Sequence, residues 1–152
     1  MNGIDCVFYR NSGTYGSPTW TEVDDILDLD ADPSWVEGDA SSRGSSVVMT
    51  EPTQMNLAIT GKIRASLADT DFVALDDAFV ARTAIDLMIL NGPSDTNGAR
   101  GWRMDFKIFG WKESQAANGV LYRDFTMKPC LSSNAPKRAV VATGAPAFTS
   151  IA

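Results

Sequence analysis

The segments GWRMDFKIFGWKE (101–113) and GVLYRDFTMK (119–128) alternate apolar and charged residues, and this pattern decides the fold. Alternation with a period of two predicts β-strands that have one apolar face, so the two segments are expected to form a long antiparallel hairpin. The short polar connection between them contains Asn118 and Gly119, which suit the positive φ angles of a hairpin turn. A hairpin of this length indicates a building element rather than a reaction site.

The first of these strands carries apolar residues on both faces. Its core face is expected to hold Trp102, Met104, Phe106 and Ile108. Phe109 and Trp111 are expected on the opposite face, together with charged residues. A strand that is partly apolar on both faces predicts burial against a second body, such as another subunit.

Composition and charge exclude several classes of function. The 152 residues include 13 basic and 19 acidic side chains, for a formal net charge of −6, which argues against electrostatic capture of nucleic acid or of an anionic membrane. There is no histidine, so a histidine-based catalytic triad and histidine-ligated metals are excluded. No apolar run approaches the ~20 residues of a spanning helix, and no signal pattern begins the chain, so we expect no membrane anchor and maturation in a cytoplasm.

The remaining segments predict a mainly β domain over 1–136. Strands are expected over 5–10, 20–32, 47–51, 54–64 and 84–90, and a helix over about 71–82, capped by Asp69 or Thr70. Residues 33–46 carry Gly, Ser, Asp and Pro without periodicity and predict a long loop, and residues 137–152 predict a C-terminal extension that orders on assembly. The expected fold is an antiparallel β-sandwich or partly closed barrel with one flanking α-helix.

Eight of the acidic residues lie between Glu22 and Asp39, with no basic residue among them. Three interpretations stay open: a glycosidase carboxylate pair, a calcium site and a solvated acidic face, the usual role of such a run. The segment DLDADPSWVEGD (28–39) departs from the calcium-loop pattern because Ser34 stands where glycine is expected. Along the predicted strand, the acidic face carries Glu22, Asp24, Asp28 and Asp30.

Five segments, in this order and spacing, resemble the tail tube proteins of tailed bacteriophages. They are VFYRNSGTYGSPTWTEV (7–23), DASSRGSS (39–46), TEPTQMNLAIT (50–60), DTDFVALDDAFVAR (69–82) and DFTMKPCLSSNAP (124–136). The resemblance implies a β-sandwich or barrel protomer that assembles into hexameric rings. Such rings stack into a hollow tube in the virion tail, assembled in the host cytoplasm, and the tube conducts DNA without binding it specifically.

The resemblance also implies partners and assigns roles to residues. Besides further copies of the chain, the expected partners are a tape-measure protein, a tail terminator and tail-tip or baseplate proteins. Carboxylates that face the lumen would repel DNA phosphates, and the strand with Glu22, Asp24, Asp28 and Asp30 is the candidate lining. Contacts between subunits or rings are expected from Trp35, Arg43, Phe109, Trp111, Lys137 and Arg138.

Two other functions remain alternatives to a tail tube. One is a carbohydrate-binding or glycoside-hydrolysing β-sandwich, in which tryptophans and acids would share a groove. The other is the tube of a phage-like injection or secretion apparatus, which has the same architecture without the genome cargo. Tail tube proteins have no catalytic residues to carry over, and the sequence predicts no cofactor and no metal.

Overall fold

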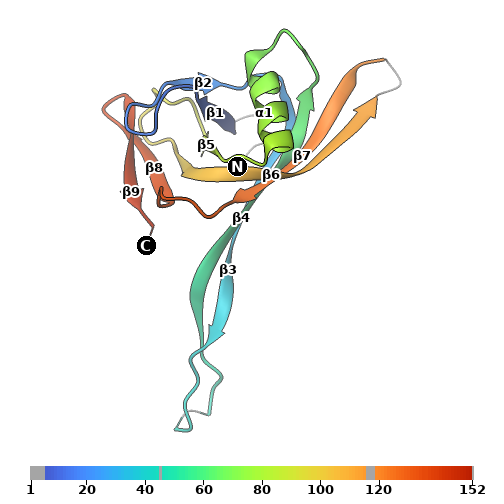
Figure 1. The fold of residues 1–152 in the computed structure, drawn as a ribbon. Coiled ribbons are helices and arrows are strands. Elements are labelled where there is room, and N and C mark those ends of the chain that lie inside the picture. Colours follow the sequence, from blue (N-terminus) through green and yellow to red (C-terminus); the bar gives the residue numbers. More distant parts are fainter. Residues whose placement is uncertain (1–5, 45, 116–118, 152) are drawn as a thin grey trace.

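A single open antiparallel sheet runs through the molecule, with one helix on one of its faces (Figure 1). The structure is a computed structural model that describes residues 6–44, 46–115 and 119–151. Its elements are β1 (Val7–Asn11), β2 (Trp20–Glu22), β3 (Ile26–Asp39), β4 (Thr50–Arg64), α1 (Thr70–Ala81), β5 (Ile85–Leu90), β6 (Arg100–Gln115), β7 (Leu121–Pro129), β8 (Lys137–Ala142) and β9 (Ala145–Ser150). The predicted mainly β antiparallel fold with one flanking helix is confirmed.

The strand order explains which edges of the sheet remain unpaired. The path is β2-β1-β5-β6-β7-β4-β3, and β8 joins β6 and carries β9. β6 has different partners on its two edges. On one edge, β8 pairs with Arg100–Arg103 and β7 pairs with Phe106–Gln115. On the opposite edge, β5 is the partner, and its pairing ends at Phe106. In the described part of the chain, no strand occupies that other edge of residues 107–115, nor the outer edge of β3.

The predicted hairpin of β6 and β7 is present, and Gly119 has the positive φ (84°) expected of its turn. Asn118, the other predicted turn residue, lies outside the described residues. We call β3, β4, β7 and residues 107–115 of β6 the long-strand sheet. It has four antiparallel strands and two unpaired edges.

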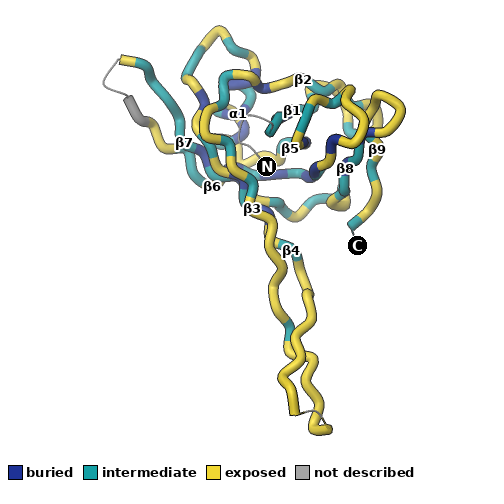
Figure 2. Tube along the Cα trace, turned by 180° about the vertical axis from the view of Figure 1, so that it is seen from behind, coloured by how far each residue is buried: buried dark blue, intermediate teal, exposed yellow. Residues whose placement is uncertain are grey.

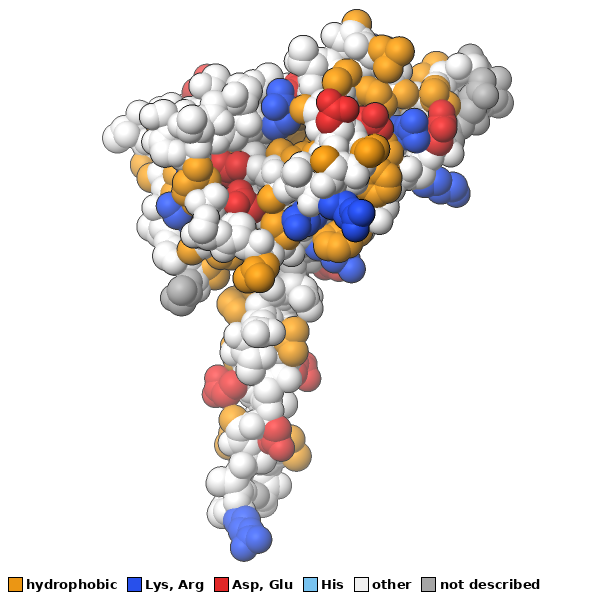
Figure 3. Space-filling view, in the orientation of Figure 1, with side chains coloured by type: hydrophobic (Ala, Val, Ile, Leu, Met, Phe, Trp, Pro, Cys, Tyr) orange, Lys and Arg blue, Asp and Glu red, His pale blue; other side chains and the backbone are white. Residues whose placement is uncertain are grey.

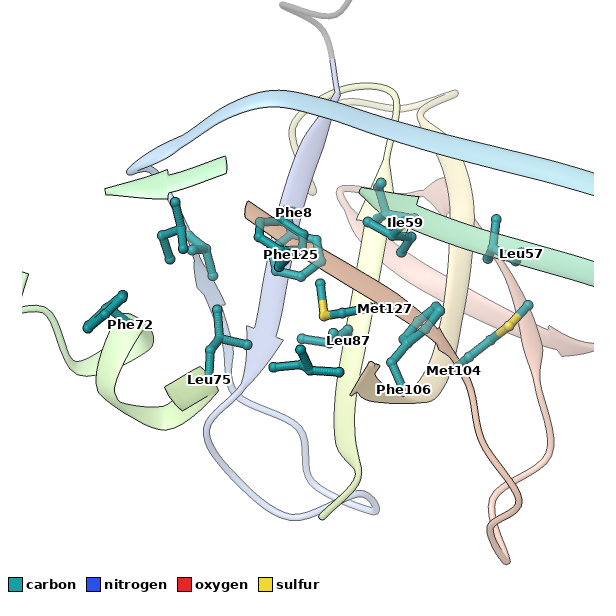
Figure 4. Close-up of a cluster of buried hydrophobic side chains, with 14 residues drawn as sticks. Phe8, Leu57, Ile59, Phe72, Leu75, Leu87, Met104, Phe106, Phe125 and Met127 are labelled. Carbon is teal, nitrogen blue, oxygen red and sulfur yellow. The ribbon is translucent and has the colours of Figure 1, made fainter. Parts of the chain in front are cut away.

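Two hydrophobic clusters hold the fold together, one on each face of β1, β5 and β6. The larger one lies between the long-strand sheet, α1 and β1, and Phe8, Phe106 and Leu75 are fully buried in it (Figure 4). The smaller one holds Met88 and Val141. Because β5 contributes alternate residues to both clusters, it is buried on both faces, as its continuous apolar sequence predicts.

The helix α1 begins and ends where the sequence predicts, within one residue. The Asp69 carboxylate accepts a 3.0 Å hydrogen bond from the backbone N–H of Asp71, as an N-cap does. The helix ends at Arg82, which adopts the left-handed conformation with φ 57° and donates its N–H back to the last turn. Phe72 and Leu75 face the core, so α1 is fixed by packing as well as by its caps.

Replacing the N-cap tests this description of α1. We expect Asp69→Ala to lower the free energy of unfolding by about 1 kcal/mol, because the N–H of Asp71 then loses its acceptor. Urea denaturation followed by circular dichroism measures the change. Asp69→Asn keeps an acceptor oxygen and serves as the control. Equal losses in both variants would show that the cap does not stabilise the helix.

The predicted long loop over 33–46 is wrong in its first half. Residues 33–39 belong to β3, which pairs with β4 from Ile26 to Asp39, and the chain reverses over 40–49. Pro33 and Gly38 argued against a strand, since proline lacks a backbone donor. However, β3 is an edge strand, and a backbone N–H on its outer side has no strand partner, so proline is tolerated there.

The residues from Lys137 onward form a hairpin and belong to the domain. β8 pairs with β6, and Ala139 and Val141 are buried in the smaller cluster. At the turn into β9, Thr143 and Gly144 have φ angles of 54° and 75°, which suit a two-residue hairpin connection. The segment predicted as a C-terminal extension therefore contributes two strands to the sheet.

Two β-bulges change which residues face the core. At a register shift between Leu27 and Asp30, Leu27 lies half exposed on the outer face. A second shift, between Ile108 and Gly110, moves Trp111 to the core side. The predicted placement of Trp111 on the face opposite the core is therefore wrong, because a bulge inserts one residue and reverses the alternation beyond it.

Candidate functional site, an open sheet and a projecting hairpin

The ends of β3 and β4 project from the body of the molecule as a two-stranded arm (Figures 1 and 2). We call residues 34–56 the arm. Nearly all of its residues are exposed, and Ser34–Asp39 alone extend it by roughly 20 Å at about 3.4 Å per residue. The hairpin is closed by hydrogen bonds of Met49 with the backbone of Ala40 and the side chain of Ser41.

The arm exposes large apolar side chains although it has no core of its own. Trp35 is 54% exposed, Val48 78% and Met49 50%. At the base of the arm, Trp35 and Met55 line a hollow of about 310 Å³ together with residues of β6 and the C-terminal segment. A two-stranded hairpin is marginally stable in water, and exposed apolar groups of this kind mark a contact surface.

Charge on the arm is separated along its length. Figure 3 shows acidic side chains along the arm and a basic one at its far end, where the connecting segment carries Arg43. Asp39 accepts a hydrogen bond from the backbone N–H of Ser41, and this bond lowers the pKa of the Asp39 carboxyl. Asp39 therefore stays ionised at neutral pH.

The face of the long-strand sheet opposite the core is polar and carries both signs of charge. One row across the strands holds Leu27, Lys62, Asp124 and Lys112, and the next holds Asp30, Thr60, Thr126 and Gly110. Beyond these rows, Asp32 lies opposite Ala58, and Lys107 lies opposite Lys128. We call this surface the outer face.

The four acids predicted to share one strand face are divided between two strands. Glu22 ends β2, and Asp24 lies in the break before β3. Asp28 sits at the bulge with a positive φ of 52°, and only Asp30 lies in register on the outer face. The structure does bring Glu22, Asp24 and Asp28 together around a polar hollow of about 150 Å³ beside Cys6.

Cys6 and Cys130 are both free thiols. Burial raises the pKa of Cys6, and the negative charge of Asp30 raises it further. Burial is also the main cause that raises the pKa of Cys130. Neither environment activates a thiolate nucleophile, because activation requires a lowered thiol pKa.

Three predicted contact residues have partners within the chain. Trp111 stacks on Phe72 of α1 with ring centroids 5.8 Å apart and donates a 2.9 Å hydrogen bond to Asp76. Arg138 lies over the ring of Trp102, and Lys137 lies over that of Tyr15. Burial, and then the charge of Arg100, lower the pKa of Arg138.

The other three predicted contact residues are exposed. Trp35 and Arg43 lie on the arm, and Phe109 is 62% exposed at the bulge of β6. Their roles between subunits therefore remain predictions that their exposure permits.

Sequence reasoning missed two charged groupings. Arg103, on the face of its strand opposite the larger cluster, is buried within the domain itself and donates a 2.7 Å hydrogen bond to Asp86. The lysines of the outer face were also missed. The sequence shows that Lys107 alternates with core residues. It does not show the bulge between Ile108 and Gly110, which puts Lys112 on the same face as Lys107.

In the described residues, no group of three or more acidic, cysteine or histidine side chains could hold a metal ion. No helix there is long and apolar enough to cross a membrane.

The fold matches tubes and tube components of solved assemblies. A chain in the tail of an empty gene transfer agent particle, with C6 symmetry, superposes with a TM-score of 0.67 and 16% identity over 93% of this chain and 99% of that one. A chain of the SPP1 tail tube superposes with a TM-score of 0.67 and 11% identity, over 84% of this chain and 74% of that one. A chain from the sheath/tube terminator structure of an extracellular contractile injection system, PVC, superposes with a TM-score of 0.52 and 10% identity. The match covers 86% of this chain and 93% of that one.

No protein-family model and no curated protein matches the sequence. At these identities the structural matches establish that the chain has the tail tube fold.

Proposed function

We propose that the chain is a structural tube subunit of a phage-type tail, which assembles into hexameric rings that stack into a hollow conduit for DNA. One observation carries the proposal: a chain with the tail tube fold contains a four-stranded sheet whose two outer edges are unpaired in the described residues. Unpaired edges are templates for strand addition, and natural proteins cover or charge them unless they are used for pairing.

The direction of the strands fits closure into a ring. In the order β3, β4, β7 and β6, neighbours are antiparallel, so β3 and β6 run in opposite directions. A copy related by rotation about an axis roughly along the strands would bring its β3 antiparallel to the β6 of its neighbour. Contacts of this head-to-tail kind close into a ring when the rotation permits.

In this assembly the outer face would line the lumen, because α1 and the core occupy the other face of the sheet. The lining would then include Asp30 and Asp32, whereas Glu22 and Asp24 would lie away from it. Lysines on the same face offset part of the repulsion of DNA that carboxylates alone would give.

The arm is the proposed contact between rings. It projects beyond the body, and its exposed Trp35, Val48 and Met49 need a partner surface. Tail terminator, tail-tip or baseplate and tape-measure proteins would meet the tube at its ends and in its lumen. The proposed role is structural and requires no catalytic group.

Electron microscopy of the purified, concentrated protein tests the proposal. We expect rings or tubes with a central channel. A protein that stays monomeric across concentration and binds glycans on an array would contradict it and favour the carbohydrate-binding alternative.

A second candidate is the tube of a phage-like injection apparatus, favoured by the match to the PVC sheath/tube terminator. Nuclease-protected DNA inside particles isolated with this chain would favour the tail. Particles of the same architecture that lack DNA and carry protein cargo would favour the injection apparatus.

A further inference from the structure

The two unpaired edges of the long-strand sheet carry opposite charges. On β3, Asp30 and Asp32 lie on the outer face and are exposed. On β6, Lys107 and Lys112 lie on the same face, also at an unpaired edge. Among the described residues, none of these four side chains makes an ion pair within the chain.

The charged groups lie at the same level of the sheet. Asp30 shares its row with Gly110 through Thr60 and Thr126, and Lys107 and Lys112 flank Gly110 along β6. When β3 of one copy is added to β6 of another without a shift, Asp30 therefore faces Gly110 and lies diagonal to both Lys107 and Lys112. Asp32 is displaced along β3 toward the level of Lys107. Diagonal neighbours across an antiparallel pair are about 7–8 Å apart, which is within reach of long side chains such as lysine.

The position of Lys107 within the chain also indicates an external anion. Lys107 lies directly opposite Lys128, and like charges placed opposite each other on neighbouring strands destabilise a sheet. Carboxylates from a neighbouring copy would relieve this repulsion. Each edge also carries an exposed apolar residue, Leu27 on β3 and Phe109 on β6, which could add apolar contact.

We propose that the acidic edge of β3 and the basic edge of β6 form the seam between adjacent copies of this chain, with Asp30 and Asp32 pairing with Lys107 and Lys112. The inference rests on the proposed tube function and assigns its subunit contact. The acids are then seam residues that compensate the lysines, and the charge pattern sets both the partner and the direction of pairing. Electrostatic complementarity acts in this way at other interfaces.

Two charge-reversal variants test the seam. Asp30→Lys with Asp32→Lys makes both edges basic, and Lys107→Asp with Lys112→Asp makes both acidic. We expect each variant alone to stay monomeric where the wild type assembles, because like charges meet at every seam. An equimolar mixture is expected to assemble, because each basic edge then meets an acidic one.

Light scattering and electron microscopy detect assembly, and native mass spectrometry with one variant isotopically labelled counts the two chains in each ring. Equal numbers of both variants are expected. Both variants keep a negative net charge, so general attraction between them cannot explain assembly of the mixture. Circular dichroism of each variant alone confirms that it is folded.

Glu22→Lys with Asp24→Lys is the matched control, since it makes the same change of net charge away from the seam. It is expected to assemble as the wild type does. Normal assembly of either charge-reversed variant alone, or no assembly of a mixture of folded variants, would overturn the seam but leave the tube function standing. A wild type that never assembles would overturn the tube function and the seam with it.

Discussion

Replacing Arg103 with alanine is expected to lower the free energy of unfolding by about 3 kcal/mol, because it removes a buried cation and leaves the carboxylate of Asp86, whose side chain is 11% exposed, without its partner. Arg103 is 4% exposed, and its guanidinium donates hydrogen bonds to Asp86, the shortest 2.7 Å, and to the backbone oxygen of Tyr15 at 2.9 Å. It also lies over the rings of Tyr15, Trp20 and Phe148. One side chain thereby joins β6 to β5, β2, β9 and the loop after β1.

Thermal and urea denaturation measure the loss, and the melting temperature is expected to fall by roughly 10 °C. Arg100→Ala, at an exposed position on the same strand, is the matched control and is expected to change stability by less than about 0.5 kcal/mol. Removing both charges by Arg103→Met with Asp86→Leu is expected to restore part of the loss, since no buried charge then remains unpaired. A loss at Arg103 no larger than at Arg100 would show that the ion pair does not stabilise the fold.

Shortening the arm is expected to abolish tubes while leaving the domain folded. Residues 36–54 are replaced by Asn-Gly, so that Trp35 and Met55, which already pair, close a two-residue turn. None of the described residues among those removed is buried, so stability should change little. Rings are still expected, because the seam lies outside the deleted segment, but stacking should fail.

Electron microscopy distinguishes rings from tubes, and denaturation checks the fold. A milder variant, Val48→Asp with Met49→Asp, keeps the arm and removes its exposed apolar groups, and it should also weaken stacking. Leu131→Asp is the control, because Leu131 is fully exposed away from the arm. Tubes of normal length from the shortened protein would show that the arm does not join rings.

The sequence predicts well those elements whose pattern is regular. The helix, the buried β5 and the hairpin of β6 and β7 follow from hydrophobic periodicity, and the cap at Asp69 follows from residue type. The strands of the arm were missed because Pro33 and Gly38 disfavour a strand, and a proline is tolerated only because β3 is an edge. Whether a strand lies at an edge depends on contacts distant in sequence.

The candidate site was harder to predict than the fold. A bulge reverses the faces beyond it, so Trp111 was placed on the wrong side by an alternation that is correct up to the bulge. The β8–β9 hairpin was missed because its strands are rich in alanine, although Thr143-Gly144 is a turn signal. The charge pairing across the two edges requires strand order, which a period-two pattern does not contain.

Hydrogen exchange of the backbone amides, compared between monomer and assembly, tests most directly whether the edges of the long-strand sheet join the copies. We expect new protection in residues 26–32 of β3 and 107–115 of β6, which gain strand partners, and little change in β9, at the far end of the β8 branch of the sheet. Assemblies in which both segments exchange as fast as in the monomer would contradict the account.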